Sequence, residues 1–203
     1  HAIIPYYSFA RSDKKDAPRI SITARLVADL LKTAGATHVM SMIFHSPQVH
    51  GFFSIPADPL SSRPVFGKYL EERDLSDFIV VAPDMGQAKS AARFAKSLSL
   101  PIAAGNKERV SDTEVKISGL VGNQVRGHER ALVYDDEIAT GGSILELSRM
   151  LIEEGIKEII VMCTHGVFTR GGLERLGDMP QISEIITTDT VYLPPEKHHP
   201  KLK

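Results

Sequence analysis

Short apolar, β-branched runs alternate along this chain with stretches of helical periodicity. After a first apolar run at the N-terminal end (AIIPYYS), the predicted strands are residues 38–44, 78–82, 101–104, 131–134, 158–163 and 184–188. The predicted helices are residues 20–34, which end before Gly35, residues 87–98, and residues 143–154, which end before Gly155. This alternation is typical of an α/β protein with a largely parallel sheet.

Two segments interrupt the alternation. Residues 46–64 are rich in Pro, Ser and Phe, and we interpret them as the crossing between two lobes. Residues 105–119 are polar and predict a loop or ribbon within the second lobe. The first lobe begins abruptly on a strand, so we expect it to be incomplete, with exposed apolar surface or reliance on a partner.

Composition narrows the class of protein. Hydrophobic residues make up 42% of the chain and charged residues 24%, and no apolar run is long enough to span a bilayer, so we expect a soluble protein with no membrane partner. Lys plus Arg (24) nearly balances Asp plus Glu (25), which argues against nucleic acid as a partner. The single Cys163 excludes an intramolecular disulfide, which fits a reducing compartment, so we expect a cytoplasmic protein. The apolar residues that flank Cys163 predict that its thiol lies in the core.

The segment ALVYDDEIATGGS has the residue types that bind phosphate. An apolar strand leads to Asp135 and Asp136, and a Thr-Gly-Gly-Ser turn then opens a helix. Glycines let the backbone approach an anion, consecutive amides form a concave nest, and a helix N-terminus adds positive partial charge. The acids follow the strand's carboxyl end, where open α/β sheets bind ligands, and they suit sugar hydroxyls or a metal-bound diphosphate.

A purely structural interpretation of the same segment stays open. Ser143 has the character of a helix N-cap, and Glu146 completes a capping box with it. The acids would then simply favour the positive end of the helix dipole. This does not explain why two acids precede two glycines directly after a buried strand, so we favour a functional interpretation.

The segment resembles the phosphoribosyl pyrophosphate motif of type I phosphoribosyltransferases and of ribose-phosphate pyrophosphokinases. The segments IFHSPQVHGFFSIP, SDFIVVAPDMGQAK, GNKERVSDTEV and VMCTHGVFT resemble pyrophosphokinase segments in the same order, and simple phosphoribosyltransferases lack the first, third and fourth. PYYSFARSDKKD resembles the family's nucleotide-contacting stretch. The resemblance covers essentially the whole chain. It implies two type I phosphoribosyltransferase-like lobes with mainly parallel sheets, residues 1–60 and 61–203, the first apparently truncated.

The resemblance implies an enzyme that transfers diphosphate from MgATP to the anomeric hydroxyl of ribose 5-phosphate, giving phosphoribosyl pyrophosphate and AMP. It makes Lys107 and Arg109 catalytic, because such a transfer needs groups that neutralise spreading negative charge. Without the resemblance, these two residues would be a solvated charge run. The residues implied to bind the sugar phosphate are Arg109, Asp135, Asp136, Ala139, Thr140, Gly141, Gly142 and Ser143.

The resemblance also implies a nucleotide site and Mg²⁺ as the cofactor. Arg11, Ser12 and His45 match nucleotide-binding positions, and His45 and Asp84 match metal positions. An imidazole is an unusual Mg²⁺ ligand because hard cations prefer oxygen, so His45 could instead bind phosphate or water. Further residues expected near the site are the aromatic Tyr6, Tyr7 and Phe9, near the adenine, and Thr164 and His165, for which packing is an equal alternative.

The chain departs from the family's pattern at three positions. Ala139 stands where an acid usually precedes Thr-Gly-Gly, Ser12 where a Gln is usual, and Gln87 where a small residue follows APDMG. Two other functions therefore stay open, a non-catalytic regulatory subunit and a phosphoribosyltransferase. As for family members, we expect a homo-oligomer with its sites at subunit junctions.

Overall fold

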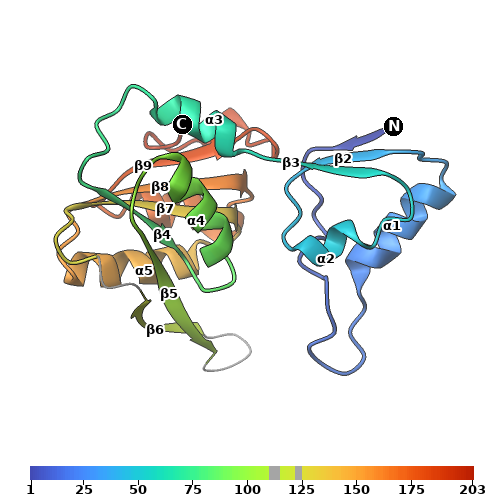
Figure 1. The fold of residues 1–203 in the computed structure, drawn as a ribbon, viewed down its shortest axis with the longest axis horizontal. Coiled ribbons are helices and arrows are strands. Elements are labelled where there is room, and N and C mark those ends of the chain that lie inside the picture. Colours follow the sequence, from blue (N-terminus) through green and yellow to red (C-terminus); the bar gives the residue numbers. More distant parts are fainter. Residues whose placement is uncertain (110–114, 122–124) are drawn as a thin grey trace. The chain divides into compact units, whose positions relative to one another are not determined.

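A computed structural model describes residues 1–109, 115–121 and 125–203 (Figure 1). For residues 107–109 and 115–118 it describes the backbone alone. The chain divides into two compact units, residues 1–62 and residues 63–203, and each is described separately below.

The first unit is a small parallel sheet with two helices. Its strand order is β1 (Ala2–Ile4), β2 (Val39–Met42) and β3 (Ala57–Leu60), and its helices are α1 (Thr23–Thr33) and α2 (Pro47–His50). The helix predicted at 20–34 and the strand predicted at 38–44 are confirmed in their central residues. The stretch 46–64, interpreted as the crossing between two lobes, does contain the boundary between the two units, but most of it belongs to the first unit, where it forms α2 and the third strand of the sheet.

Aromatic packing forms the centre of the first unit. The Tyr7 ring packs against Phe44 and Phe53, with centroids 5.7 and 5.5 Å away, and the Tyr7 hydroxyl donates to the Ala24 carbonyl oxygen at 2.8 Å. Burial, with a smaller contribution from Asp29, raises the pKa of Tyr7 to about 12. Apolar side chains are also exposed on this unit, among them Ile3, Leu26, Leu30 and Leu60.

The second unit is built on a six-stranded sheet of order β6-β5-β4-β7-β8-β9. The strands are β4 (Phe78–Ala82), β5 (Ile102–Arg109), β6 (Val115–Val121), β7 (Arg130–Ile138), β8 (Glu158–Gly166) and β9 (Ile182–Thr188). All neighbouring pairs are parallel except β5 and β6, which form an antiparallel ribbon. The ribbon within the polar segment 105–119 is therefore confirmed, and the parallel sheet places several strand ends at one edge.

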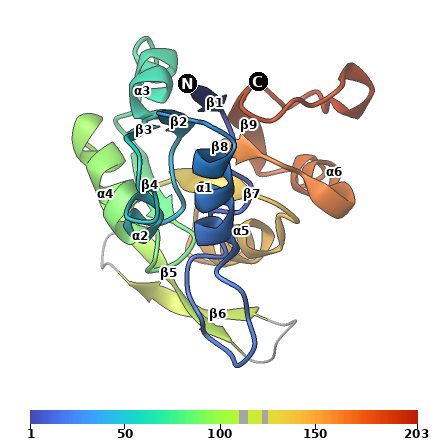
Figure 2. The same cartoon turned by 90° about the vertical axis from the view of Figure 1, so that its right-hand side faces the viewer.

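Helices cover both faces of this sheet (Figures 1 and 2). On one face, α3 (Arg63–Leu70) and α4 (Ala88–Ser97) pack against the sheet around Phe66, Phe94 and Tyr134, and the Phe94 and Tyr134 rings stack with centroids 4.5 Å apart. The other face is covered by α5 (Gly142–Glu153) and α6 (Gly172–Gly177). Residues of β7 alternate between the two cores, so the strand that leads to the candidate loop is held from both sides.

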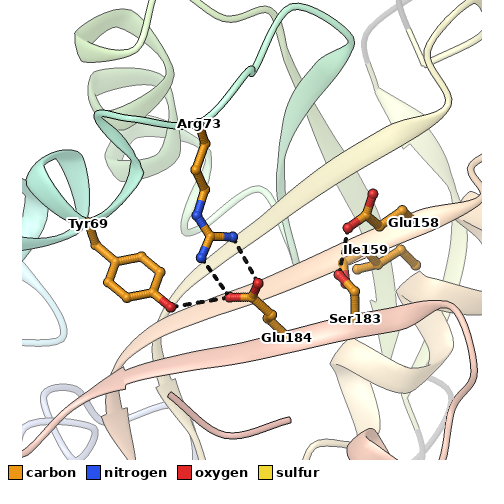
Figure 3. Close-up of polar contacts among 6 residues, drawn as sticks. All are labelled: Tyr69, Arg73, Glu158, Ile159, Ser183 and Glu184. Carbon is orange, nitrogen blue, oxygen red and sulfur yellow. Dashed lines mark hydrogen bonds and ion pairs between the residues drawn. The ribbon is translucent and has the colours of Figure 1, made fainter.

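An ion pair links the segment after α3 to β9 (Figure 3). The guanidinium of Arg73 donates to both carboxylate oxygens of Glu184, at 2.9 and 3.1 Å. Tyr69 donates to the same carboxylate at 3.3 Å, and the Arg73 guanidinium lies 4.8 Å from the centre of the Tyr69 ring. This arrangement fixes the long connection between α3 and β4 against the far strand of the sheet.

Two remaining predictions concern Cys163 and membranes. Cys163 is buried in β8, as predicted, and burial raises the pKa of its thiol far above the ordinary value, so the thiol is unreactive. Among the described residues, no helix combines the length and apolar character needed to cross a bilayer.

Candidate functional site: a loop between β7 and α5

The candidate loop begins later than the sequence pattern predicts. β7 continues through Ile138, because Asp135, Glu137 and Ile138 pair in register with Cys163, His165 and Gly166 of β8. The strand predicted at 131–134 is therefore too short, and the expectation that Asp135 and Asp136 follow its carboxyl end, in the loop before the helix, is wrong. Both acids are strand residues, and the extended backbone holds them more rigidly than a loop would.

The two acids form a tight pair at the end of β7. The Asp136 amide donates to Oδ1 of Asp135 at 2.8 Å, and Asp136 is only 8% exposed. Burial raises the pKa of Asp135 well above its ordinary value, and the negative charges of Asp136 and, more weakly, Asp84 add to this effect. The Asp84 carboxylate is therefore within electrostatic reach of the pair, and cationic or hydroxyl-bearing ligands would relieve the repulsion.

We call residues 139–143 the anion loop. Gly141 has a φ of 75°, a left-handed conformation that a side chain disfavours, and it is the residue immediately before α5. The helix begins at Gly142, so Ser143 lies inside its first turn and is not the N-cap. The alternative of a capping box with Ser143 as the N-cap is thus wrong, whereas the suggestion that the acids favour the positive end of the helix dipole is not affected.

The carbonyl groups of the anion loop are held by the protein. Just before the loop, the carbonyl of Ile138, the last residue of β7, accepts from the amides of Val167 and Phe168, both at 3.0 Å. Within the loop, the carbonyl of Gly141 accepts from the amide of Leu145 of α5 at 3.0 Å. The carbonyl of Thr140 accepts a 2.5 Å hydrogen bond from the guanidinium of Arg175. These bonds direct the carbonyl oxygens of Ile138, Thr140 and Gly141 toward the segment before α6, α6 and α5, respectively.

Unlike the carbonyls of Thr140 and Gly141, the amides at the start of the loop have no hydrogen-bond partner in the described part of the protein. Within the part of the chain that the structure describes, the amides of Thr140, Gly141 and Gly142 donate no hydrogen bond to a protein group. Thr140 and Gly142 are exposed, and Ser143 is half-buried. A row of N–H groups in front of a helix is a suitable binding site for a phosphate oxygen.

Other predicted site residues of the second unit lie on neighbouring strands. Asp84 follows the end of β4, and its Oδ1 accepts from the Gln87 amide at 3.1 Å. Lys107 and Arg109 are in β5, where their backbones pair with Ile117 and Val115 of β6. The side chains of these two basic residues lie outside the described part of the structure, so their catalytic assignment stays a prediction.

Thr164 and His165 are buried at the end of β8. The Thr164 carbonyl accepts from the hydroxyls of Thr188 and Thr190, at 2.6 and 3.1 Å, and Nδ1 of His165 lies 2.8 Å from the Thr190 hydroxyl. These contacts join the ends of β8 and β9. Both residues thus have a packing function next to the candidate site, as one of the two alternatives expected.

The nucleotide residues predicted from the sequence belong to the first unit. Arg11 and His45 are exposed. Ser12 supports the start of α1, because its hydroxyl donates to the Ser21 carbonyl at 2.9 Å and accepts from the Thr23 amide at 3.1 Å. Tyr7 is a buried core residue, which makes it unsuitable for stacking on an adenine, whereas Phe9 is 45% exposed.

The predicted metal ligands are divided between the units, with His45 in the first and Asp84 in the second. Among residues 1–109, 115–121 and 125–203, no group of three or more His, Cys, Asp or Glu side chains is arranged to hold a metal ion. The Asp84 carboxylate suits Mg²⁺ by its oxygen chemistry, whereas the imidazole of His45 does not. Joint binding of one ion by these two residues stays a prediction.

Two residues that support the loop were not found from the sequence. Gly172 and Arg175 of α6 contact the anion loop from a segment more than thirty positions away. The Gly171–Gly172 pair was the available signal, because adjacent glycines indicate close backbone packing. Nothing local in the sequence indicates which backbone they approach.

The fold and this loop define an α/β protein of the phosphoribosyltransferase type, with an acid pair in a central strand and an amide-rich turn after that strand. Residues 1–35 match the family model for the N-terminal domain of ribose phosphate pyrophosphokinase. Over nearly its whole length, the chain is similar to members of the ribose-phosphate pyrophosphokinase family.

Individual relatives show this similarity in detail. A Streptomyces coelicolor protein is 50% identical over 201 residues, which are 99% of this chain and 63% of that protein. The Deinococcus radiodurans ribose-phosphate pyrophosphokinase is 44% identical over 97% of this chain and 61% of its own length. The crystal structure of phosphoribosylpyrophosphate synthetase from Mycobacterium smegmatis superposes with a TM-score of 0.89 at 38% identity, covering 100% of this chain and 65% of that one. The chain thus spans about three-fifths of the length of the relatives it matches.

Proposed function

We propose that the protein containing this chain is a cytoplasmic ribose-phosphate diphosphokinase, which transfers diphosphate from MgATP to the anomeric hydroxyl of ribose 5-phosphate. The observation that carries the proposal is the anion loop: the carbonyls of Thr140 and Gly141 are bonded within the protein, while the amides of Thr140, Gly141 and Gly142 have no protein acceptor among the described residues. The names of the relatives and the likeness over 97–99% of the chain support it.

In the proposed complex, the 5-phosphate of the sugar lies on the amides of the anion loop. The positive end of α5 and the hydroxyls of Thr140 and Ser143 strengthen this contact. Asp135 and Asp136 then accept hydrogen bonds from the ribose hydroxyls, because they lie just before the loop on a rigid strand. Ala139 contributes its backbone only, since it has no side chain that could bind the ligand.

The anomeric hydroxyl attacks the β-phosphorus of ATP in this reaction. A new oxygen–phosphorus bond forms, the bond between the β-phosphorus and the oxygen of the α-phosphate breaks, AMP leaves, and the hydroxyl proton passes to solvent. Lys107 and Arg109 neutralise charge on the transferred group. Arg11, Ser12 and His45 bind the nucleotide, and Asp84 is the residue whose oxygens suit Mg²⁺, which when bound offsets phosphate charge.

Two measurements test the proposal. Calorimetric titration of the 203-residue chain with ribose 5-phosphate tests the loop, and AMP release from ATP, Mg²⁺ and ribose 5-phosphate by the complete natural protein tests the reaction. Absence of AMP release from a protein that binds both substrates would exclude the enzyme.

A non-catalytic regulatory subunit is the second candidate, because Ala139 leaves the loop without its usual acid. This candidate predicts that the protein is inactive alone and copurifies with an active relative. A phosphoribosyltransferase would instead release pyrophosphate when supplied with phosphoribosyl pyrophosphate and a base.

For the proposed enzyme we also expect homo-oligomers with sites at subunit junctions. Sedimentation analysis of the natural protein measures the oligomeric state.

A further inference from the structure

Helix α6 packs its backbone directly against the anion loop. A Cβ atom on Gly172 would lie 2.9 Å from the Ala139 carbonyl oxygen and 3.0 Å from that of Thr140. Gly172 has a φ of −65°, which any residue can adopt, so glycine is needed there only for space. On the other side of the contact, a Cβ on Gly141 would meet the Leu176 side chain at 3.2 Å.

Arg175 extends from the same helix to the loop. Its terminal nitrogen Nη2 donates to the Thr140 carbonyl at 2.5 Å, while its Nε donates to the Gly171 carbonyl at 3.2 Å. One guanidinium thus joins the first residue before α6 to the centre of the anion loop. A planar guanidinium can make both bonds at once, whereas an ammonium group lacks this fixed fork.

Peptide geometry connects these carbonyls to the amides that would bind phosphate. In a planar trans peptide the N–H points away from the C=O of the preceding residue. Since the Thr140 carbonyl is directed toward Arg175, the Gly141 amide points to the opposite side of the loop. The Ala139 carbonyl lies against Gly172 in the same way, and this directs the Thr140 amide away from α6.

We propose that Arg175 is a positioning residue for the anion loop, which holds the Thr140–Gly141 peptide so that its amide can bind the phosphate of a sugar phosphate. This inference rests on the proposed function for the identity of the ligand. Arg175 acts through the backbone and does not contact the substrate. Gly172 permits the arrangement because it leaves room for both carbonyls.

The experiment compares four variants of the natural protein with the wild type. Arg175→Met removes both hydrogen bonds, Arg175→Lys keeps the charge without the fork, and Gly172→Ala disturbs the same carbonyls without touching the guanidinium. Arg126→Met is the matched control, because it removes an exposed arginine that pairs with Glu154. Each protein is titrated with ribose 5-phosphate, and the amide resonances of Gly141 and Gly142 are recorded by NMR without ligand.

We expect Arg175→Met to weaken ribose 5-phosphate binding about tenfold, the effect of one lost hydrogen bond to a charged group. Arg175→Lys should recover part of this loss, Gly172→Ala should also weaken binding, and Arg126→Met should bind like the wild type. The Gly141 resonance should move in Arg175→Met and stay in place in Arg126→Met. A purely structural function of Arg175 would lower the melting temperature without this local shift.

Unchanged binding in Arg175→Met, or an unmoved Gly141 resonance in that variant, would overturn the inference. A wild type that does not bind ribose 5-phosphate is a different result, because it refutes the ligand given under the proposed function. In that case a Gly141 resonance that moves only in Arg175→Met and Gly172→Ala still supports Arg175 as the residue that holds the loop.

Discussion

The Asp136 amide donates a 2.8 Å hydrogen bond to Oδ1 of Asp135, so two neighbouring acids of one strand are joined through the backbone. The bond fixes the Asp135 side chain beside the buried Asp136. Because burial and the charge of Asp136 both disfavour ionisation, the pKa of Asp135 is raised. The free protein therefore carries an electrostatic cost at the site where we propose that ribose hydroxyls bind.

We predict that Asp135→Asn stabilises the free protein at neutral pH and weakens ribose 5-phosphate binding. A raised folded-state pKa means that Asp135 contributes stability below its unfolded pKa, about 3.9, and loses it as pH rises through the folded value. The stability gained by Asp135→Asn should thus grow above pH ~4, by at most about 1.4 kcal/mol per pH unit. Urea unfolding between pH 4 and 8 measures it.

Asp74→Asn is the control for this pH dependence. The Ser76 amide donates to Asp74 at 3.0 Å and lowers its pKa, so the sign of the effect is reversed. This variant should be less stable than the wild type at neutral pH, and the difference should vanish as pH falls below the lowered pKa. If both variants shift stability in the same direction, the electrostatic explanation of Asp135 is wrong.

The ion pair between Arg73 and Glu184 should contribute measurably to stability. Both side chains are partly buried, with exposed fractions of 32% and 23%, and the contact is bidentate. We expect Arg73→Met to lower the free energy of unfolding by about 1–3 kcal/mol. The matched control, Arg126→Met, breaks a pair whose arginine is 85% exposed, and it should cost clearly less stability because solvent screens the pair. Equal losses in denaturant unfolding would contradict this ranking.

Two glycines of the second unit should respond to alanine in opposite directions. Gly141→Ala places a side chain at a φ of 75° and against Leu176, so it should cost about 1–2 kcal/mol of stability. Gly67 lies inside α3 with open space around it, and Gly67→Ala should stabilise the protein by up to about 1 kcal/mol. Thermal unfolding of both variants, with ribose 5-phosphate titration as a second readout for Gly141→Ala, checks the pair.

In the natural protein, Lys107→Ala should lower the turnover rate much more than the affinity for ribose 5-phosphate. If Lys107 stabilises the transition state, turnover should fall about a hundredfold or more while the affinity for ribose 5-phosphate changes by a modest factor. Steady-state kinetics of AMP release combined with calorimetry measures both quantities. Equal losses of turnover and affinity would assign Lys107 to ground-state binding instead.

Local patterns in the sequence were sufficient for much of the fold. The run FIVVA predicted β4 with the bounds that the structure shows, and helix α4 lies within one residue of its prediction at each end. Both elements are specified by side chains that are near one another in sequence. The pattern failed at residues 57–60, because Ala-Asp-Pro-Leu has the local character of a loop and becomes β3 only by pairing with β2.

The sequence by itself determined the parallel α/β framework, the position of the acid pair and the glycine turn after it, because each depends on residue types at fixed local spacing. Only the tertiary structure decided how far β7 extends, since the pairing of Asp135 and Glu137 with β8 sets its end. The same holds for the anion loop, whose Thr140 carbonyl is held by an arginine 35 positions away. Such contacts follow from the packing of α6 on the loop, and no local pattern of residues encodes that packing.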